Sequence, residues 1–337
     1  MIKIPIMRNV NILLADADTC LVQAITHNLR AMGFQSIHSV KNATDAIAYI
    51  RAQPVSFLIT EWDIKGTSGI ELVRYLRRGE DSPNRALPII MLTGRGELAD
   101  VQAARDVGIT EFVVKPFSTQ TLFSRIEQLV DKPRAFVVAK AYVGPERRRR
   151  GLPPPGVDDR RIIKPIAAVP SPDVLKAMPG HPPLLVSADF TLRHQISGNK
   201  PLSSIITPDI LKEAQKVIDA MADGSLDWLR EDISMMQQAY DALQKVYSLA
   251  AMDAIKDAAL SIKARSGTFG YRMASDVARL LYLFLTTDFK ATNPRHLVVI
   301  EKHLQVLTII LAQKIKERVG IGSDLYLELE RLIAVNR

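Results

Sequence analysis

Four short apolar runs in the first third of the chain each lead directly into a polar residue. Runs of this length, bounded by turn-forming residues, are typical of strands buried in a parallel sheet. The carboxyl ends of parallel strands meet at one edge of a sheet, so the polar side chains are expected to lie close together there. The runs cover residues 11–15, 57–60, 88–92 and 111–114, and the polar residues at their ends are Asp16, Glu61, Thr93 and Lys115.

The residue types at these strand ends resemble the receiver domain of bacterial two-component response regulators, over about residues 9–131. Receivers carry an acidic pair after the first strand, an Asp phosphoacceptor after the third, Thr or Ser after the fourth and Lys-Pro after the fifth. The resemblance implies an α/β, doubly wound, five-stranded parallel sheet in residues 1–132. It also implies roles for five positions: Asp16 as the first acid, Glu61 at the acceptor position, Thr93 as the switch hydroxyl, Phe112 as the switch aromatic residue and Lys115 as the phosphate-pairing ammonium.

Two positions depart from the receiver pattern. The second acid of the pair is Ala17, and the acceptor position holds Glu61 in place of Asp. During phosphoryl transfer Mg²⁺ neutralises charge, and it is usually held by one or two carboxylates with water and phosphate oxygens. Glu places its carboxylate one methylene further out, and a misplacement of about 1 Å can cost ~100-fold in rate. We therefore expect phosphorylation to be disabled, with no catalytic residue and no cofactor.

Asp18 is the nearby acid that could stand in for the missing ligand, although it need not point into the pocket. If the pocket is still active, Asp16, Asp18 and Glu61 would be the metal ligands and Mg²⁺ the cofactor; otherwise no metal site is expected. Glu61 carries one negative charge where phosphoaspartate carries nearly two. The site is thus expected either to mimic part of the phosphorylated state or to be a pocket that merely folds, and the residues alone leave both readings open.

The stretch from Pro133 to Lys200 has an unusual composition. It holds 12 basic residues against five acidic ones, and 11 of the 19 prolines of the chain. Such a composition predicts a Pro- and Arg-rich linker over residues 133–203, largely extended or disordered. Within it, residues 134–143 contain an apolar core and are a candidate for a short docked strand. The four arginines Arg147, Arg148, Arg149 and Arg150 could contact phosphates of nucleic acid, but no aromatic residues lie between them to stack bases, which favours a solvated linker.

From Thr207 onward the pattern becomes helical. Thr207-Pro208-Asp209 combines an N-cap residue, a first-turn proline and an acid at the positive end of a helix. Apolar residues then recur at intervals of three and four positions, which predicts amphipathic helices. Short connections favour antiparallel neighbours, so residues 204–337 are expected to form an all-α helical bundle. The expected helices cover about 226–246, 246–265, 273–287, 294–318 and 323–335.

One segment of this region, Leu260 to Tyr271, resembles the histidine-phosphotransfer motif. In that family a His on a helix surface carries the phosphoryl group, a Lys three positions on pairs with it, and a later Gly lets the partner receiver approach. Lys263 and Gly270 match, whereas Leu260 occupies the His position. Leucine has no nucleophilic nitrogen, so this domain is expected to be unable to carry phosphate. His296 and His303 lie seven residues apart on a later helix and are interpreted as ordinary core or surface residues.

Both halves thus resemble phosphorelay modules that lack the atom taking the phosphoryl group. This predicts a non-enzymatic two-component adaptor whose partners are a histidine kinase, a phosphotransfer protein or a receiver domain, with the first receiver helix, about Thr19 to Met32, as a docking surface. A homodimer would also be compatible. The alternative is a working phosphorelay protein that uses Glu61 or Asp63 as acceptor; a nucleic-acid-binding regulator acting through the Arg run is a third reading. A single cysteine, Cys20, and the absence of a signal peptide or membrane span favour the cytoplasm.

Overall fold

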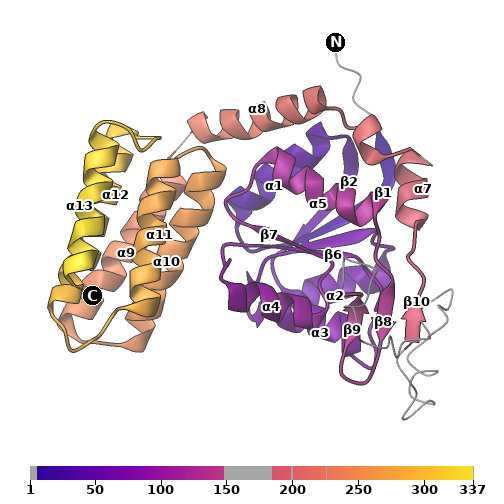
Figure 1. Cartoon of the computed structure of the whole chain (residues 1–337), viewed down its shortest axis with the longest axis horizontal. Helices are drawn as coiled ribbons and strands as arrows, with labels where there is room; N and C mark the ends of the chain where they lie inside the picture. Colours follow the sequence, from indigo (N-terminus) through magenta and orange to yellow (C-terminus); the bar gives the residue numbers. More distant parts are fainter. Residues whose placement is uncertain (1–5, 148–183, 199, 225, 337) are drawn as a thin grey trace, which may run out of the picture. The chain divides into compact units, whose positions relative to one another are not determined.

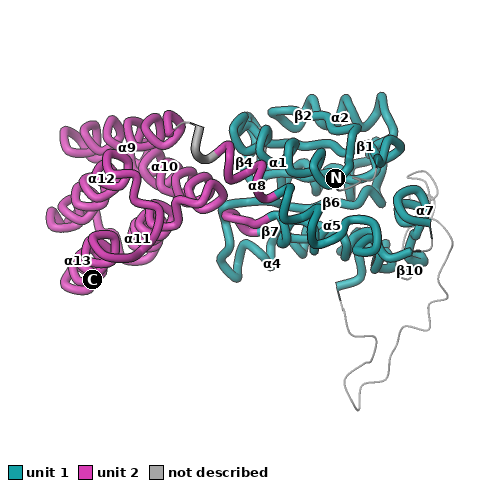
Figure 2. The backbone as a smooth tube through the Cα atoms, turned by 90° about the horizontal axis from the view of Figure 1, so that it is seen from above, with its two compact units in different colours: residues 1–113, 119–214 teal, residues 114–118, 215–337 magenta. Residues whose placement is uncertain are grey.

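The computed structural model describes residues 6–147, 184–198, 200–224 and 226–336. The chain divides into two compact units (Figure 2). The first, called here the α/β unit, comprises Met1–Val113 and Thr119–Ala214, and the second, the helical unit, comprises Val114–Ser118 and Gln215–Arg337. The division falls inside one helix, α8 (Pro208–Gly224), between Ala214 and Gln215.

The α/β unit is built on a five-stranded parallel sheet with the strand order β2-β1-β3-β6-β7. The central strands are buried along their whole length, which explains why they appear in the sequence as continuous apolar runs. The register sets Ala15 opposite Thr60 and Thr60 opposite Met91, so neighbouring strands end almost level. The strands are β1 (Met7–Ala15), β2 (Phe34–Val40), β3 (Phe57–Thr60), β6 (Ile89–Thr93) and β7 (Glu111–Val114).

Helices cover both faces of this sheet (Figure 1). On one face lie α1 (Thr19–Ala31) and α5 (Thr119–Asp131); on the other lie α2 (Ala43–Ala52), α3 (Gly69–Arg78) and α4 (Leu98–Val107). Residues of α2 and α3 pack with alternate residues of β1 and β3 in one apolar core. A small hairpin, β4 (Asp63–Ile64) with β5 (Thr67–Ser68), follows β3. The predicted doubly wound α/β fold is confirmed.

The part of the predicted linker that the structure describes contains folded elements, more of them than the one short strand expected within residues 134–143. Three short strands form an antiparallel sheet with the order β10-β8-β9, followed by a helix and a turn of 3₁₀ helix. The sheet closes because four apolar side chains, one or two from each strand, form a small core of their own. Residues 148–183 lie outside the described residues, and with them Arg148, Arg149 and Arg150. The elements are β8 (Phe136–Val138), β9 (Val143–Pro145), β10 (Leu184–Val186), α7 (Thr191–Ser197) and η1 (Leu202–Ser204).

A buried arginine stands where β8 and β9 meet the rest of the α/β unit. Arg77 of α3 has no exposed surface, and its three guanidinium nitrogens each donate to a backbone carbonyl at 2.8 Å, those of Gly108, Arg85 and Leu87. Its guanidinium carbon lies 5.4 Å from the centre of the Phe136 ring. Burial lowers the pKa of Arg77 to about 9. The side chain therefore ties α3, the loop before β6, the turn before β7 and strand β8 together.

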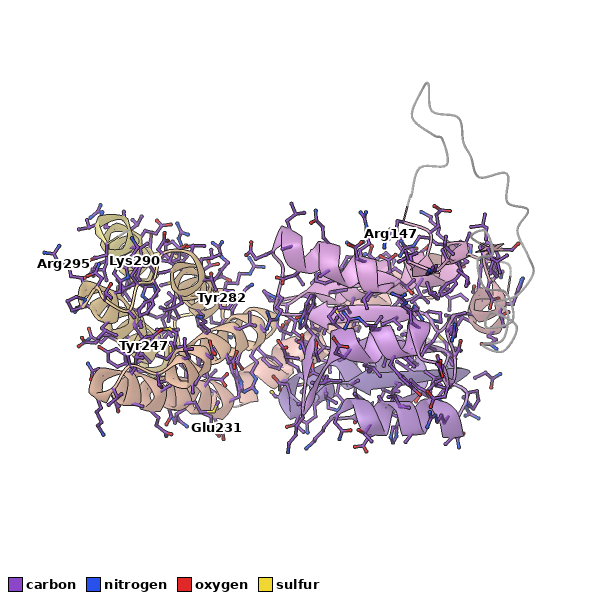
Figure 3. All side chains as sticks on the ribbon, turned by 90° about the horizontal axis from the view of Figure 1, so that it is seen from below. Arg147, Glu231, Tyr247, Tyr282, Lys290 and Arg295 are labelled. Atoms are coloured by element: carbon purple, nitrogen blue, oxygen red, sulfur yellow. The ribbon has the colours of Figure 1, made fainter. Side chains whose placement is uncertain are left out.

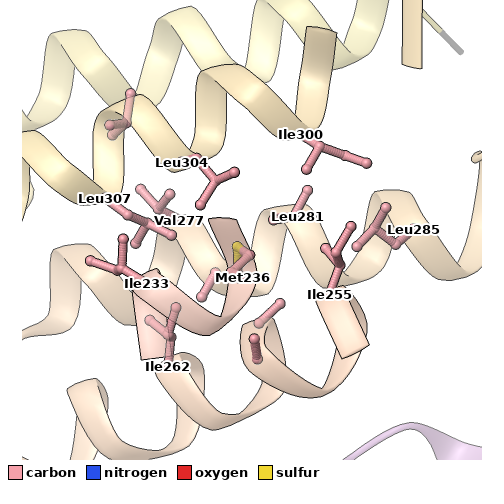
Figure 4. Close-up of a cluster of buried hydrophobic side chains, with 14 of the residues drawn as sticks. Ile233, Met236, Ile255, Ile262, Val277, Leu281, Leu285, Ile300, Leu304 and Leu307 are labelled. Carbon is pink, nitrogen blue, oxygen red and sulfur yellow. The ribbon is translucent and has the colours of Figure 1, made fainter. Parts of the chain in front are cut away.

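The helical unit is a bundle whose helices begin and end close to the predicted positions. Helices α9, α10, α11 and α12 pack in a closed ring, each against the next, and α13 packs on α11 and α12. Aliphatic side chains from all four ring helices meet in the centre (Figure 4), among them Met236, Ile255, Leu281 and Leu304. The predicted all-α bundle is confirmed. The helices are α9 (Asp227–Lys245), α10 (Leu249–Thr268), α11 (Arg272–Thr287), α12 (Arg295–Gln313) and α13 (Ile321–Val335).

Helix α12 is, among the described residues, the one helix long and apolar enough to cross a membrane by length and composition. In this structure it is also a ring helix of the bundle, and Val299, Ile300, Leu304 and Leu307 belong to the bundle core. A core helix passes the same test of length and composition, so its hydropathy is accounted for by burial in the bundle.

Candidate functional site

The predicted site residues lie at the carboxyl edge of the five-stranded sheet. Asp16 follows β1, Glu61 follows β3, Thr93 closes β6 and Lys115 follows β7. These strands are consecutive in the sheet, so the four strand ends lie next to one another, as the sequence predicted. The backbone ties them as well, because the Glu61 N–H donates to the carbonyl of Ala15 at 2.9 Å.

The two acids after β1 have different environments. Asp16 is buried, and its Oδ1 accepts from the backbone N–H of Asp18 at 2.9 Å. The carboxylate of Asp18 is the N-cap of α1: its Oδ1 accepts from the N–H groups of Cys20 and Leu21 at 3.0 and 3.1 Å. Such a cap satisfies donors that the first turn of a helix otherwise leaves without a partner. The two hydrogen bonds of this cap therefore hold the Asp18 carboxylate over the N-terminus of α1.

Glu61 is half-buried at the acceptor position, and its side chain turns back on its own loop. Its Oε1 accepts from the backbone N–H of Trp62 at 2.5 Å. The loop closes tightly here, because the N–H of Gly69 donates to the Trp62 carbonyl at 2.6 Å. A Cβ at position 69 would lie 2.0 Å from the Glu61 carbonyl oxygen, so only glycine fits. The sequence could not reveal this rotamer, since it depends on a contact with the next residue in a tight turn.

Two residues that the sequence did not point to, Trp62 and Arg95, join Asp63 in connecting the two neighbouring loops of the pocket. Arg95, two positions after Thr93, donates from Nε to Asp63 Oδ2 at 2.9 Å, and its guanidinium carbon lies 5.7 Å from the Trp62 ring centre. The backbone N–H of Arg95 donates to the buried Thr93 Oγ1 at 3.2 Å. Asp63 and Arg95 are both partly exposed, so the pair contributes little to stability. Asp63, the alternative acceptor, is thus engaged in an ion pair in this structure.

Lys115 and Phe112 belong to the last strand of the sheet and its end. Lys115 is 2% exposed, and the peptide bond to Pro116 is cis. Phe112 is half-buried and packs against the apolar core shared by β1, β3, α2 and α3. Lys115 is thus buried at the end of β7, and Phe112 packs on one face of the sheet.

The carboxylates at this edge do not fit the magnesium site that a receiver implies. Such a site takes oxygen ligands in near-octahedral geometry. Position 17 offers a methyl group, and the nearest substitute, Asp18, caps α1. Glu61 uses one of its oxygens to accept from its own loop.

Comparison with known proteins finds matches to the first third of the chain. The model of the response regulator receiver domain matches residues 12–127. The chemotaxis protein CheY of Pseudomonas aeruginosa is 30% identical over 121 residues, which cover 36% of this chain and 96% of that protein. The chain belongs to the response-regulator receiver family. The receiver indicates a role in two-component signalling, and receiver domains interact with histidine kinases and phosphotransfer partners.

Further relatives share the same part of the chain. The phosphate regulon transcriptional regulatory protein PhoB of Rhizobium meliloti is 32% identical over 128 residues, 38% of this chain and 55% of that protein. Among solved structures, chemotaxis protein CheY4 of Vibrio cholerae is 24% identical and covers 35% of this chain and 97% of its own, with a TM-score of 0.33. The receiver domain of the sensor histidine kinase PA1611 from Pseudomonas aeruginosa is 23% identical over 35% of this chain and 94% of its own, with a TM-score of 0.32. Residues 215–337 of the helical unit lie outside the receiver match, whereas its residues 114–118 lie within it.

The phosphotransfer-like motif of the helical unit lies on α10 and the turn after it. Leu260 and Lys263 are half-buried on α10. Gly270 lies beyond the helix end with φ of +77°, and the next N–H, that of Tyr271, donates to the Ser266 carbonyl at 2.7 Å. This geometry terminates a helix and favours glycine. Gly270 is therefore explained by the turn itself.

Side chains near this motif are tied into the bundle. Asp232 of α9 has no exposed surface, and it pairs with Arg265 at 3.3 Å and accepts from Ser261 Oγ at 3.1 Å, both on α10. His296 is buried, and its Nδ1 accepts from the backbone N–H of Lys290 at 2.9 Å. The interpretation of His296 and His303 as ordinary residues agrees with their burial.

Of the Arg run, Arg147 is the one described member (Figure 3). Its guanidinium carbon lies 4.0 Å from the Tyr142 ring centre, and Nη1 lies 3.1 Å from Asp106 Oδ1. Both partners belong to the α/β unit, so Arg147 packs on the receiver's own surface.

Proposed function

We propose that this chain is a two-component signalling protein whose receiver acts as a non-catalytic adaptor, by binding partners instead of accepting a phosphoryl group. The main support is the environment of the acceptor edge. The second acid is Ala17, the nearest substitute caps α1, and Glu61 is held by its own backbone. Phosphoryl transfer depends on positioning and on charge neutralisation, and this edge lacks the second acid of the pair and has Glu61 in place of the acceptor Asp.

The partners that fit this proposal are a histidine kinase or a phosphotransfer protein. The helical unit, in which Leu260 stands at the position of the phosphotransfer His, would supply a second binding surface without carrying phosphate. We infer that neither Mg²⁺ nor another cofactor is needed, that nucleic acid is not the partner and that the protein acts in the cytoplasm, where its single cysteine stays reduced.

Intact mass after incubation with acetyl phosphate and Mg²⁺ tests the proposal. Wild type should stay unmodified, because the carboxylate of Glu61 is one methylene too long and the second acid is missing. The Glu61→Asp variant that also carries Ala17→Asp should gain one phosphoryl group, because it has the full set of acids of the receiver pattern. Glu61→Asp alone shows whether the acceptor or the metal ligand is the main obstacle.

A phosphoryl group on wild type would refute the adaptor proposal, and the modified residue would then have to be mapped, with Asp63 as the first candidate. The reference for this experiment is the Lys115→Met form of the double variant. It should lose the modification, since the ammonium that pairs with phosphate in the receiver pattern is gone.

A further inference from the structure

A polar side chain belongs to the buried stripe of α1, together with Leu21, Ala24, Ile25 and Leu29. Asn28 has no exposed surface. Its Nδ2 donates to Thr119 Oγ1 of α5 at 2.5 Å and lies 3.5 Å from the carbonyl oxygen of Ala214 on α8. Its Oδ1 is buried and has no hydrogen-bond partner. Another segment of the α/β unit therefore covers α1 at this point, and it does so without satisfying the amide completely.

The covering segment is the chain that enters α8. Within α8 the buried positions Ile210, Leu211 and Ala214 follow the spacing of a helical stripe, while Asp209 and Lys212 are exposed. A stripe with spacings of three and four residues is the face that a helix buries against a neighbour. The buried residues of the segment are Leu202, Ile206, Ile210, Leu211 and Ala214.

Two contacts fix the direction of this segment. At its start, the N–H of Leu202 donates to Asp131 Oδ2 at 2.7 Å, and Asp131 is the last residue of α5. At its end, Ala214 lies beside Asn28, which is bonded to Thr119, the first residue of α5. The segment thus runs antiparallel along α5 and beside α1, on the face of the sheet that these two helices cover (Figure 1).

We propose that the surface formed by α1 and α5 is a helix-binding site that the chain occupies with its own segment Leu202–Ala214. The partner that fits it is a helix with an apolar stripe of the same spacing, and such a helix must displace the start of α8. The proposal rests on the proposed function in one respect: the displacing helix would belong to the kinase or phosphotransfer partner.

The incomplete satisfaction of Asn28 weakens the docked arrangement. A buried acceptor without a partner destabilises the closed arrangement, because water would satisfy it in the open one. The docked segment has the advantage of a high effective concentration, since it is joined to the same chain. The tether favours the docked segment and the unsatisfied acceptor disfavours it. The segment therefore occupies the site in the resting protein, and a competing helix can displace it.

A labelled peptide of residues 202–216 is the probe for the open site. Wild type should bind it weakly, because the site is already filled. Ile210→Asp places a charge in the buried stripe and should release the segment. Since apparent affinity scales with the open fraction, this variant should bind the peptide at least about ten-fold more tightly. Lys212→Asp, which adds a carboxylate on the exposed side of the same helix, should bind it as wild type does.

Amide hydrogen exchange on the same proteins tests the second half of the proposal. In Ile210→Asp the amides of 206–214 should lose protection, while those of β3 and β6 keep it. Asn28→Leu removes the unsatisfied acceptor and should slow exchange of 206–214 by about ten-fold. Loss of protection in β3 and β6 of Ile210→Asp would overturn the proposal, because α8 would then be part of the sheet's core.

Equal peptide binding by wild type, Ile210→Asp and Lys212→Asp, or no binding by any of them, would also overturn it. No phosphodonor is used in these experiments. A wild-type protein that accepts phosphate would therefore refute the adaptor proposal only. The proposal that the chain occupies its own α1 and α5 surface would still be tested by the peptide-binding experiment.

Discussion

Replacement of Arg77 by methionine should lower the free energy of unfolding of the α/β unit by about 3 kcal/mol. The change removes three hydrogen bonds from a charged donor to the carbonyls of Gly108, Arg85 and Leu87, each contributing roughly 1.5–3 kcal/mol. Relief of the desolvation that lowers the pKa of Arg77 to about 9 offsets part of this loss. The change in the free energy of unfolding is measured by urea denaturation, followed by Trp62 fluorescence in a Trp228→Phe background.

Arg74→Met is the matched control, because Arg74 is an exposed arginine one turn earlier on the same helix. Its free energy of unfolding should stay within about 0.5 kcal/mol of wild type. An Arg77→Met variant as stable as this control would mean that the three carbonyls find other partners, and that the small sheet of β8, β9 and β10 docks without the guanidinium.

Acid should destabilise the helical unit through His303. This residue of α12 has no exposed surface; its Nδ1 lies 2.7 Å from the Val299 carbonyl, and its Nε2 has no hydrogen-bond partner. Burial lowers the pKa of His303 to about 4, against an ordinary value of 6.5, although the bond to Val299 acts in the opposite direction. The folded state therefore resists a proton that the unfolded state accepts.

The pH window follows from these two values. Above pH 6.5 the residue is neutral in both states and has no effect. As the pH falls from 6.5 to about 4, the unfolded state binds the proton and stability is lost, by about 3 kcal/mol in total. In His303→Leu this part of the loss should be absent. The test is urea denaturation at pH 7, 6, 5 and 4, followed by Trp228 fluorescence in a Trp62→Phe background.

The carboxylates of the chain titrate in both proteins, so the difference between the two curves isolates His303. Parallel curves for wild type and His303→Leu would contradict the prediction. They would show that the bundle opens locally and lets water reach the imidazole before it unfolds.

Much of the fold could be predicted because it depends on local patterns of apolar residues in the sequence. Continuous apolar runs marked β1, β3, β6 and β7, and the three- and four-residue spacing marked the helices of the bundle within a few residues of where they begin and end. The region 133–203 was predicted less well. Its proline and arginine content is typical of linkers, but β8 pairs with β10 across more than 40 residues, and Arg77 supports β8 from a distant helix.

The candidate site divides in the same way. Residue type and order placed Asp16, Glu61, Thr93 and Lys115 at consecutive strand ends. The hydrogen-bond and ion-pair partners of each side chain could not be predicted from the order of residues alone. Asp18 caps α1 and Arg95 pairs with Asp63 because of where neighbouring loops bring backbone and charge together.

By itself, the sequence determined the two kinds of fold, the edge of the sheet at which the polar residues gather, and the absence of Asp at position 61 and of His at position 260. These depend on hydrophobic periodicity and on side-chain chemistry, which are local properties. Only the tertiary structure decided that Arg77 is buried, that Glu61 bonds to its own loop, and that the start of α8 covers Asn28. Each of these arises when segments distant in sequence exclude water from one another, and hydrogen-bond partners are then chosen by proximity in space.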